Sequence, residues 1–256
     1  MIIKDKKIIA FDLDGTLAVS KRPITEDMAH LVEELTKQKI VVIISGGTFY
    51  QFNTQFLPAF SKDGFLPSFV KNLILLPTSG SQRYEYNLEK KEWIMTDMEP
   101  FPNEVKEKAK KILREMIDSG LYDIPKDSIG EYIEDRITQL SISALGQDAP
   151  IEQKKLWDPD QKKRQKMKAV LGKKLPETSI IIGGTTTIDI LTKDFTKAVG
   201  LMRLLNKLGM KKENMLFVGD AIFPGGNDYS AYQAGIDTIQ VGGPEETSVY
   251  IKDWIR

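Results

Sequence analysis

Two aspartates, Asp12 and Asp14, follow a run of apolar residues near the start of the sequence, and a Gly-Thr pair follows them. The apolar run, Ile8–Phe11, is short and rich in β-branched residues, which predicts a buried strand. Burying a carboxylate is costly unless it pairs with a cation or binds a metal ion. Ligands of open α/β sheets bind at the carboxyl ends of the strands. The two aspartates therefore mark a candidate reactive site.

Other apolar runs also end in small or acidic residues. Residues 40–44 are followed by Ser45 and Gly46, and residues 215–218 are followed by Gly219 and then Asp220. If the sheet is parallel, these strand ends converge on one edge. Three carboxylates gathered there would repel one another unless a cation lay among them. Oxygen ligands from carboxylates, water and a substrate phosphate are those that Mg²⁺ prefers.

This set of groups is suited to phosphoryl transfer. A carboxylate beside Mg²⁺ can attack phosphorus and form an aspartyl-phosphate, while the cation offsets the charge on the phosphoryl oxygens. The hydroxyl of Ser45 and nearby backbone amides can hold those oxygens. Lys197, at the start of a predicted helix, is the best placed lysine to complete the charge balance. Taken alone, Lys197 is more typical of a solvated helix position, and a glycine turn after Ser45 is common, so both depend on their context.

The elements that must position these groups alternate in type. We predict an α/β fold with a parallel sheet, because continuous apolar strands alternate with amphipathic helices at both ends of the chain. The predicted strands are 8–11, 40–44, 73–76, 215–218 and 238–241, and the predicted helices are 25–37, 48–56, 198–208 and 228–234.

The middle of the chain has a different pattern. Residues 84–93 suggest antiparallel structure; helices are predicted at 104–119 and 160–171, and strands at 132–133, 139–143, 179–182 and 187–191. We therefore expect a core formed by residues 1–86 and 191–256, interrupted by an α+β cap at residues 87–190.

Composition excludes several classes of function. Lys plus Arg equals Asp plus Glu, at 36 each, which gives no support for a nucleic-acid or membrane-surface partner. The absence of cysteine excludes disulfides and thiolate chemistry and fits a cytoplasmic location. No signal peptide or membrane span is visible. The single histidine, His30, lies in an amphipathic helical pattern, which favours a structural role over a Ser–His triad or a histidine metal site.

Four motifs, in the same order along the chain, resemble those of the haloacid dehalogenase-like phosphotransferases. They are Asp12-Leu13-Asp14-Gly15-Thr16, Ser45-Gly46, Lys197, and Gly219-Asp220 with Asn227-Asp228. The resemblance implies a Rossmann-like core that uses Mg²⁺. It assigns Asp12 as nucleophile and metal ligand, and Asp14 as general acid/base and metal ligand through its backbone carbonyl. It also implies that Ser45, Gly46 and Lys197 bind the phosphoryl group, that Asp220 is the third metal ligand, and that Asn227 and Asp228 support the water shell of the metal.

The insertion is similar to the large cap of the Cof-type members of this superfamily, subfamily IIB. The loop 219–228 and two cap segments, 134–143 and 183–189, are most similar to eukaryotic-type phosphomannomutases. By this resemblance Arg136, Thr187 and Asp189 contact the substrate, although Arg136 and Asp189 could instead form a structural ion pair.

One cap position departs from the mutase pattern. Gln147 stands where these mutases have a second cap arginine. Because a mutase must bind a phosphate at two places in turn, loss of a bidentate donor weakens the second place. We therefore favour a Mg²⁺-dependent phosphohydrolase of small phosphorylated metabolites, with sugar phosphates as the expected substrates. The alternatives are a phosphohexomutase and a non-catalytic sugar-phosphate-binding protein. The resemblance also allows a homodimer formed through the cap.

Overall fold

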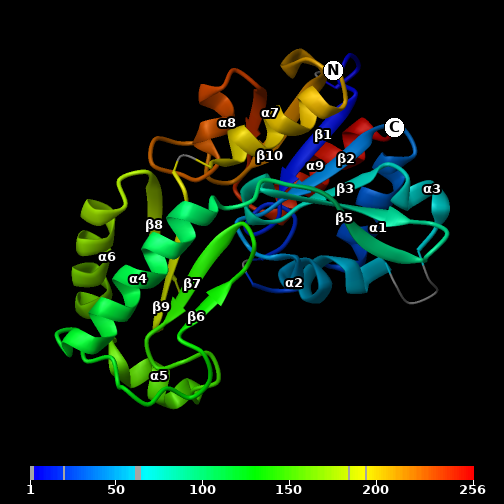
Figure 1. Ribbon diagram of the computed structural model, residues 1–256. Helices are drawn as coiled ribbons and strands as arrows, with labels where there is room; N and C mark the ends of the chain where they lie inside the picture. The colour runs from blue at the N-terminus through cyan, green and yellow to red at the C-terminus, as the bar shows by residue number, and fades with distance from the viewer. Residues whose placement is uncertain (1–2, 20, 61–64, 184, 194) are drawn as a thin grey trace. The chain divides into compact units, whose positions relative to one another are not determined.

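The computed structural model (Figure 1) describes residues 3–19, 21–60, 65–183, 185–193 and 195–256. It divides into two compact units, a core formed by Met1–Met98 with Phe195–Arg256 and a cap formed by Glu99–Asp194. The core contains a parallel-dominated sheet with helices on both faces, so the predicted α/β class is confirmed.

The core sheet has seven strands in the order β11-β10-β1-β2-β3-β4-β5. Neighbouring strands are parallel from β11 to β3, and β4 and β5 add an antiparallel hairpin. The strands are β1 (Ile8–Asp12), β2 (Ile40–Ile44), β3 (Leu73–Leu76), β4 (Gln82–Asn87), β5 (Glu92–Met98), β10 (Met215–Gly219) and β11 (Asp237–Gln240). Because β1 is central and parallel to β2 and β10, the ends of these three strands lie side by side.

Alternate residues of the parallel strands pack into two separate hydrophobic clusters, one on each face of the sheet. One face is covered by α1 (Glu26–Thr36), α3 (Pro67–Val70) and α9 (Pro244–Trp254), and the other by α7 (Lys197–Lys207) and α8 (Tyr229–Gln233) (Figure 1). Burial on both faces explains why these strands are apolar throughout. Thr25 caps α1 as expected, since its side chain accepts a hydrogen bond from the amide of Met28.

Two segments differ from the sequence prediction. The helix predicted at 48–56 is composite: α2 (Phe49–Gln51) continues into a π-helix (Phe52–Phe56) and then a 3-10 helix (Leu57–Phe60). The helix α9 (Pro244–Trp254) was not predicted from the sequence, although Pro244 at its start and two glutamates in its first turn are ordinary helix-start signals. None of the helices in the described part of the chain is long and apolar enough to cross a membrane.

The cap contains a four-stranded antiparallel sheet in the order β6-β7-β9-β8 and a hydrophobic cluster of its own. Its elements are α4 (Asn103–Ser119), β6 (Ile133–Asp135), β7 (Gln139–Ser143), α5 (Ile151–Trp157), α6 (Lys162–Lys174), β8 (Thr178–Gly183) and β9 (Thr187–Thr192). Apolar side chains of α4 and α6 pack on one face of this sheet.

The boundary between the units differs from the expected one. The expected break after residue 86 falls inside β4, whereas β5 pairs with β4 along its whole length. Arg203 of α7 also donates hydrogen bonds to the Asp97 carboxylate at 3.1 Å and to the Met98 carbonyl at 2.7 Å. The hairpin therefore belongs to the core, and the cap begins at Glu99 and ends at Asp194, not at 87 and 190.

Candidate active site

The carboxyl ends of the central strands carry a buried charge cluster. Asp12, the last residue of β1, and Asp228, just before α8, are both almost fully buried. The ammonium group of Lys197, itself 2% exposed at the first turn of α7, lies 2.5 Å from Asp12 Oδ1 and 2.6 Å from Asp228 Oδ1. Residues from three distant parts of the chain therefore meet in one ion-paired group.

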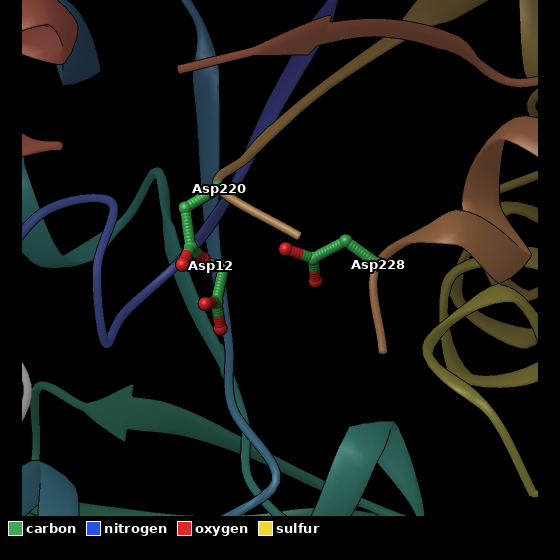
Figure 2. Close-up of side chains that lie close together, drawn as sticks. All are labelled: Asp12, Asp220 and Asp228. Carbon is green, nitrogen blue, oxygen red and sulfur yellow. The ribbon is translucent and has the colours of Figure 1, made fainter. Parts of the chain in front are cut away.

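Three carboxylates of this cluster lie close enough to share a cation. Oxygen atoms of Asp12, Asp220 and Asp228 lie within 4.8 Å of one another, and Figure 2 shows the three side chains converging. Hard carboxylate oxygens in this number suit Mg²⁺. Asp228 already accepts hydrogen bonds on both oxygens, from Lys197 and from the amide of Ala221 at 3.1 Å. That arrangement favours a supporting role for Asp228. Asn227 is exposed and directly precedes it.

The turn after β1 explains the Gly-Thr pair. Gly15 has a φ of +79°, and a Cβ there would lie 2.5 Å from Asp220 Oδ2. Only glycine combines this backbone conformation with the close approach of Asp220. The next residue, Thr16, is fully buried, and its hydroxyl donates to Asp220 Oδ1 at 3.5 Å. The pair thus holds the carboxylate of Asp220, which directly follows β10, against the end of β1.

Burial governs the protonation of the cluster. Burial raises the pKa of Asp12 to about 7, with the Asp228 charge adding to the shift and Lys197 opposing it. Burial alone would lower the pKa of Lys197, but Asp12 and Asp228 outweigh it and raise the value. A divalent cation would favour the ionised form of Asp12, so the residues fit a metal ion in their chemistry as well as their spacing.

Asp14 lies beyond the strand. β1 ends at Asp12, so Asp14 is not positioned by the alternation of strand residues. Its carboxylate instead accepts hydrogen bonds from the side-chain amides of Gln51 and Gln55, at 2.6 and 2.8 Å, and from the amide of Lys21 at 2.7 Å. The two glutamines were not singled out from the sequence, and no pattern in their segment distinguished them from surface residues of a helix.

The loop after β2 places Ser45 beside this group. Ser45 is buried, and its hydroxyl donates to Gln51 Oε1 at 3.0 Å. The neighbouring Gly46 is exposed, and a Cβ there would project into open space, so the loop leaves room next to Ser45. A pocket of about 460 Å³ adjoins these residues. It is lined by Asp14, Lys21, Pro23, Gly47, Tyr50, Gln51, Thr54 and Gln55.

Two glycines allow α7 to reach the site. A Cβ on Gly200 would lie 2.3 Å from the carbonyl oxygen of Ser79 and 2.7 Å from the Cα of Gly80. The helix therefore contacts the loop after β3 backbone to backbone. That loop in turn holds the Ser45 loop, because the amide of Ser79 donates to the Ser45 carbonyl at 2.8 Å. Lys197 and Ser45 are thus positioned by one continuous set of backbone contacts.

The predicted cap residues share one face of the cap sheet, opposite its helices. Asp189 pairs with Ser141 in the β7–β9 register, and Thr187 pairs with Ser143. Arg136 lies 2.7 Å from the carboxylate of Glu134 and 4.0 Å from Asp189. Burial raises the pKa of Asp189, although the nearby Ser141 hydroxyl and the Arg136 guanidinium oppose the shift. Gly184, which the resemblance also cites, lies outside the described residues.

Comparisons with known proteins agree with the motifs. Residues 9–231 match the family described as haloacid dehalogenase-like hydrolase. The phosphomannomutase of Encephalitozoon cuniculi (strain GB-M1) is 30% identical over 251 residues, which cover 95% of this chain and 91% of that protein. A probable phosphomannomutase of Caenorhabditis elegans is 25% identical over 264 residues, covering 98% and 96%.

Solved structures share the fold. A haloacid dehalogenase-like hydrolase from Bacteroides thetaiotaomicron matches with a TM-score of 0.64 at 17% identity, covering 97% of this chain and 99% of that chain. An N-terminally truncated, IMP-bound IMP-nucleotidase from Plasmodium falciparum matches with a TM-score of 0.60 at 16% identity, covering 98% of this chain and 68% of that chain. With the family match over residues 9–231 and the motifs in place, the chain belongs to the haloacid dehalogenase-like hydrolases.

Proposed function

We propose that this protein is a Mg²⁺-dependent phosphohydrolase of small phosphorylated metabolites that acts through a phosphorylated Asp12. The observation that carries the proposal is the buried Asp12 at the end of β1, 2.5 Å from Lys197 and grouped with two further carboxylates. A structural ion pair would need one carboxylate for one lysine. Three clustered carboxylates, of which Lys197 contacts two, call for a second cation, which the family chemistry supplies.

The proposed reaction has two steps. An Asp12 oxygen bonds to phosphorus as the ester P–O bond breaks, and the leaving oxygen takes a proton from Asp14. Water then attacks the phosphorus, its proton passes to Asp14, and Asp12 is released together with inorganic phosphate. Lys197 and the backbone of the loop at Ser45 and Gly46 hold the phosphoryl oxygens in both steps. Asp12, Asp220 and the Asp14 carbonyl would hold Mg²⁺, with Asn227 and Asp228 in support, and the ion would offset charge on the phosphoryl group.

Sugar phosphates are the proposed substrate class because the face of the cap sheet opposite its helices is polar and incompletely hydrogen bonded. Among the described residues, Ser141 Oγ and Asp189 Oδ1 on this face, and Gln147 Nε2 in the loop after β7, are buried atoms without a hydrogen-bond partner. Buried polar atoms are costly when unpaired, so these atoms are suited to a ligand rich in hydroxyl groups. Arg136 and Thr187 complete the proposed binding face.

A phosphohexomutase is the second candidate, and one contact favours it. The ammonium group of Lys154 donates to the Gln147 carbonyl oxygen at 2.7 Å. A cation therefore lies beside the position where the resemblance expects a second arginine, although a lysine lacks the bidentate geometry of an arginine. The similarity to two phosphomannomutases supports the same candidate.

One assay separates the candidates. The protein is incubated with Mg²⁺, mannose 1-phosphate and a trace of hexose bisphosphate, and mannose 6-phosphate and free phosphate are followed together. Phosphate released faster than mannose 6-phosphate supports the hydrolase, and the reverse supports the mutase. A panel of other phosphorylated metabolites is assayed in parallel, with Asp12→Asn as the control. If no compound is turned over by the wild type, the protein would be a binding protein and the proposed chemistry would be refuted.

A further inference from the structure

The carboxylate of Asp14 is surrounded by N–H donors on both of its oxygens. Gln51 donates to Oδ2, and Gln55 and the Lys21 backbone amide donate to Oδ1, with all three distances between 2.6 and 2.8 Å. Gln55 is 4% exposed, so its amide is buried beside the half-buried carboxylate that it contacts. A half-buried side chain in a turn would ordinarily sample several rotamers. Here these three hydrogen bonds hold the Asp14 side chain in a single rotamer.

The hydrogen bonds also fix the direction of each amide. A carboxylate only accepts, so the NH₂ group of Gln51 must face Asp14, and its Oε1 faces away toward Ser45. The Ser45 hydroxyl donates to that Oε1, and the Gln51 NH₂ group also donates to Gln55 Oε1 at 2.7 Å. A chain of hydrogen bonds with one direction thus runs from Ser45 through Gln51 to Asp14. Gln55 supports the second of these bonds, because it accepts from Gln51 and donates to Asp14.

The local backbone is built to present these two side chains. Gln51 is the last residue of α2, and Gln55 lies within the π-helix that follows, a feature often found at functional sites. Residues four apart share one helix face. Gly47 provides the space, because a Cβ there would lie only 1.6 Å from Gln51 Oε1.

We propose that Gln51 and Gln55 are positioning residues that aim Asp14 for proton transfer to the leaving oxygen, with Gln51 also linking Asp14 to the phosphoryl-binding Ser45. The inference rests on the proposed function, in which Asp14 is the general acid. As Asp14 gives up its proton, charge develops on its oxygens, and hydrogen bonds to a charged acceptor are stronger than those to a neutral one. The two amides therefore stabilise the transition state more than the ground state.

The identity of the leaving group distinguishes this role from a structural one. A sugar alkoxide needs the proton as the P–O bond breaks, whereas 4-nitrophenolate leaves without it. Loss of the glutamine amides should therefore slow the cleavage of a sugar phosphate and spare 4-nitrophenyl phosphate. Damage to the fold or to phosphate binding would slow both.

The test uses Gln51→Met and Gln55→Met, which keep side-chain length and remove the amide. Asn53→Met, at an exposed position of the same π-helix, is the matched control. For each glutamine variant we expect kcat/KM, which reports the steps through cleavage of the P–O bond, to fall by about 10- to 100-fold on the most active sugar phosphate, a part of the full effect of a general acid, with less than about threefold change in kcat/KM for 4-nitrophenyl phosphate. The control should match the wild type with both substrates.

A third variant covers the case in which a buried glutamine cannot be replaced without unfolding. Gly47→Ala keeps both amides but pushes the Gln51 side chain away from Ser45, at a position without a left-handed backbone. It should show the same preference for the activated substrate. Equal losses with both substrates, or no loss, would overturn the inference while leaving the proposed function standing. A folded wild type that is inactive on both substrates would overturn both.

Discussion

Replacement of Asp12 by asparagine should make the metal-free protein more stable at alkaline pH, relative to the wild type, while abolishing turnover. Asp12 is 4% exposed, and burial raises its pKa to about 7 from an ordinary value near 3.8. A carboxyl whose pKa is raised by folding binds its proton more tightly in the folded state. Its contribution to stability is therefore complete below about pH 4 and is lost as the pH rises through about 7.

The size of the effect follows from the two pKa values. A gap of about three pKa units corresponds to about 4 kcal/mol over the full range, of which about 3 kcal/mol falls between pH 5 and pH 8. Asparagine does not titrate, so the free energy of unfolding of the variant lacks this dependence on pH. The free energy of unfolding of the wild type, minus that of Asp12→Asn, should fall by about that amount between the two pH values.

The measurement is urea denaturation in EDTA, followed by circular dichroism, for both proteins at both pH values. Taking the difference removes the contribution of every group that titrates alike in the two proteins. Repeating the alkaline series with excess Mg²⁺ should stabilise the wild type more than the variant, because the ion replaces the proton on Asp12. A difference that does not change with pH would mean that Asp12 is already ionised in the metal-free fold, and the burial argument would fail.

Four further outcomes are expected. Gly200→Ala should lower the free energy of unfolding in urea by about 1–3 kcal/mol, despite the better helix propensity of alanine, because the added Cβ meets the Ser79 carbonyl. It should also lower kcat by moving Lys197. Unchanged values for both would argue against the backbone contact. Asp158→Asn should destabilise the protein by about 3–5 kcal/mol near neutral pH, since it breaks a buried pair with Arg164. Burial would raise the pKa of Asp158, but Arg164 and two backbone amides outweigh it and lower that pKa. The loss of stability in Asp158→Asn should therefore shrink as the pH falls below the ordinary pKa of an aspartate. Arg136→Gln should raise KM for a sugar phosphate about tenfold, the loss of one charge-assisted contact, and leave 4-nitrophenyl phosphate within about twofold; an equal effect on both would favour the structural ion pair. EDTA should abolish phosphate release and Mg²⁺ should restore it, and activity that persists in EDTA would exclude the metal.

The ends of the core strands were predictable from the sequence because local information defines them. Ile8–Phe11 and residues 40–44 are apolar runs that stop at a charged or small residue, and the structure ends β1 and β2 within one residue of those positions. Asp228 was found only through the order of the motifs along the chain, and Lys197 also depended on that context. No local pattern indicates that Lys197 contacts Asp12, which lies 185 positions away in the sequence.

The surroundings of Asp14 could not be predicted in this way. Glutamines at positions 51 and 55 fit an ordinary helix surface, and the i to i+5 bonding of the π-helix, such as the Leu57 amide to the Phe52 carbonyl, has no clear sequence signal. The place of β5 was also missed, because its pairing with β4 depends on contacts across the sheet more than on its own weak alternation. The residues that carry chemistry were thus easier to identify than those that orient them.

The attachment of the cap has a consequence for how this protein can diversify. Arg203 fastens the last residues before the cap, Asp97 and Met98, to α7, the helix that follows the cap in sequence. The arginine lies six residues, or about 9 Å of helix, beyond Lys197. The core thus ties together the two points at which the cap enters and leaves, and the cap has its own hydrophobic cluster. An inserted module held in this way can be exchanged or redesigned with little loop-closure cost to its host. Recombination at residues 98 and 195 should therefore provide a route to new substrate specificity that leaves the phosphoryl-transfer machinery unchanged.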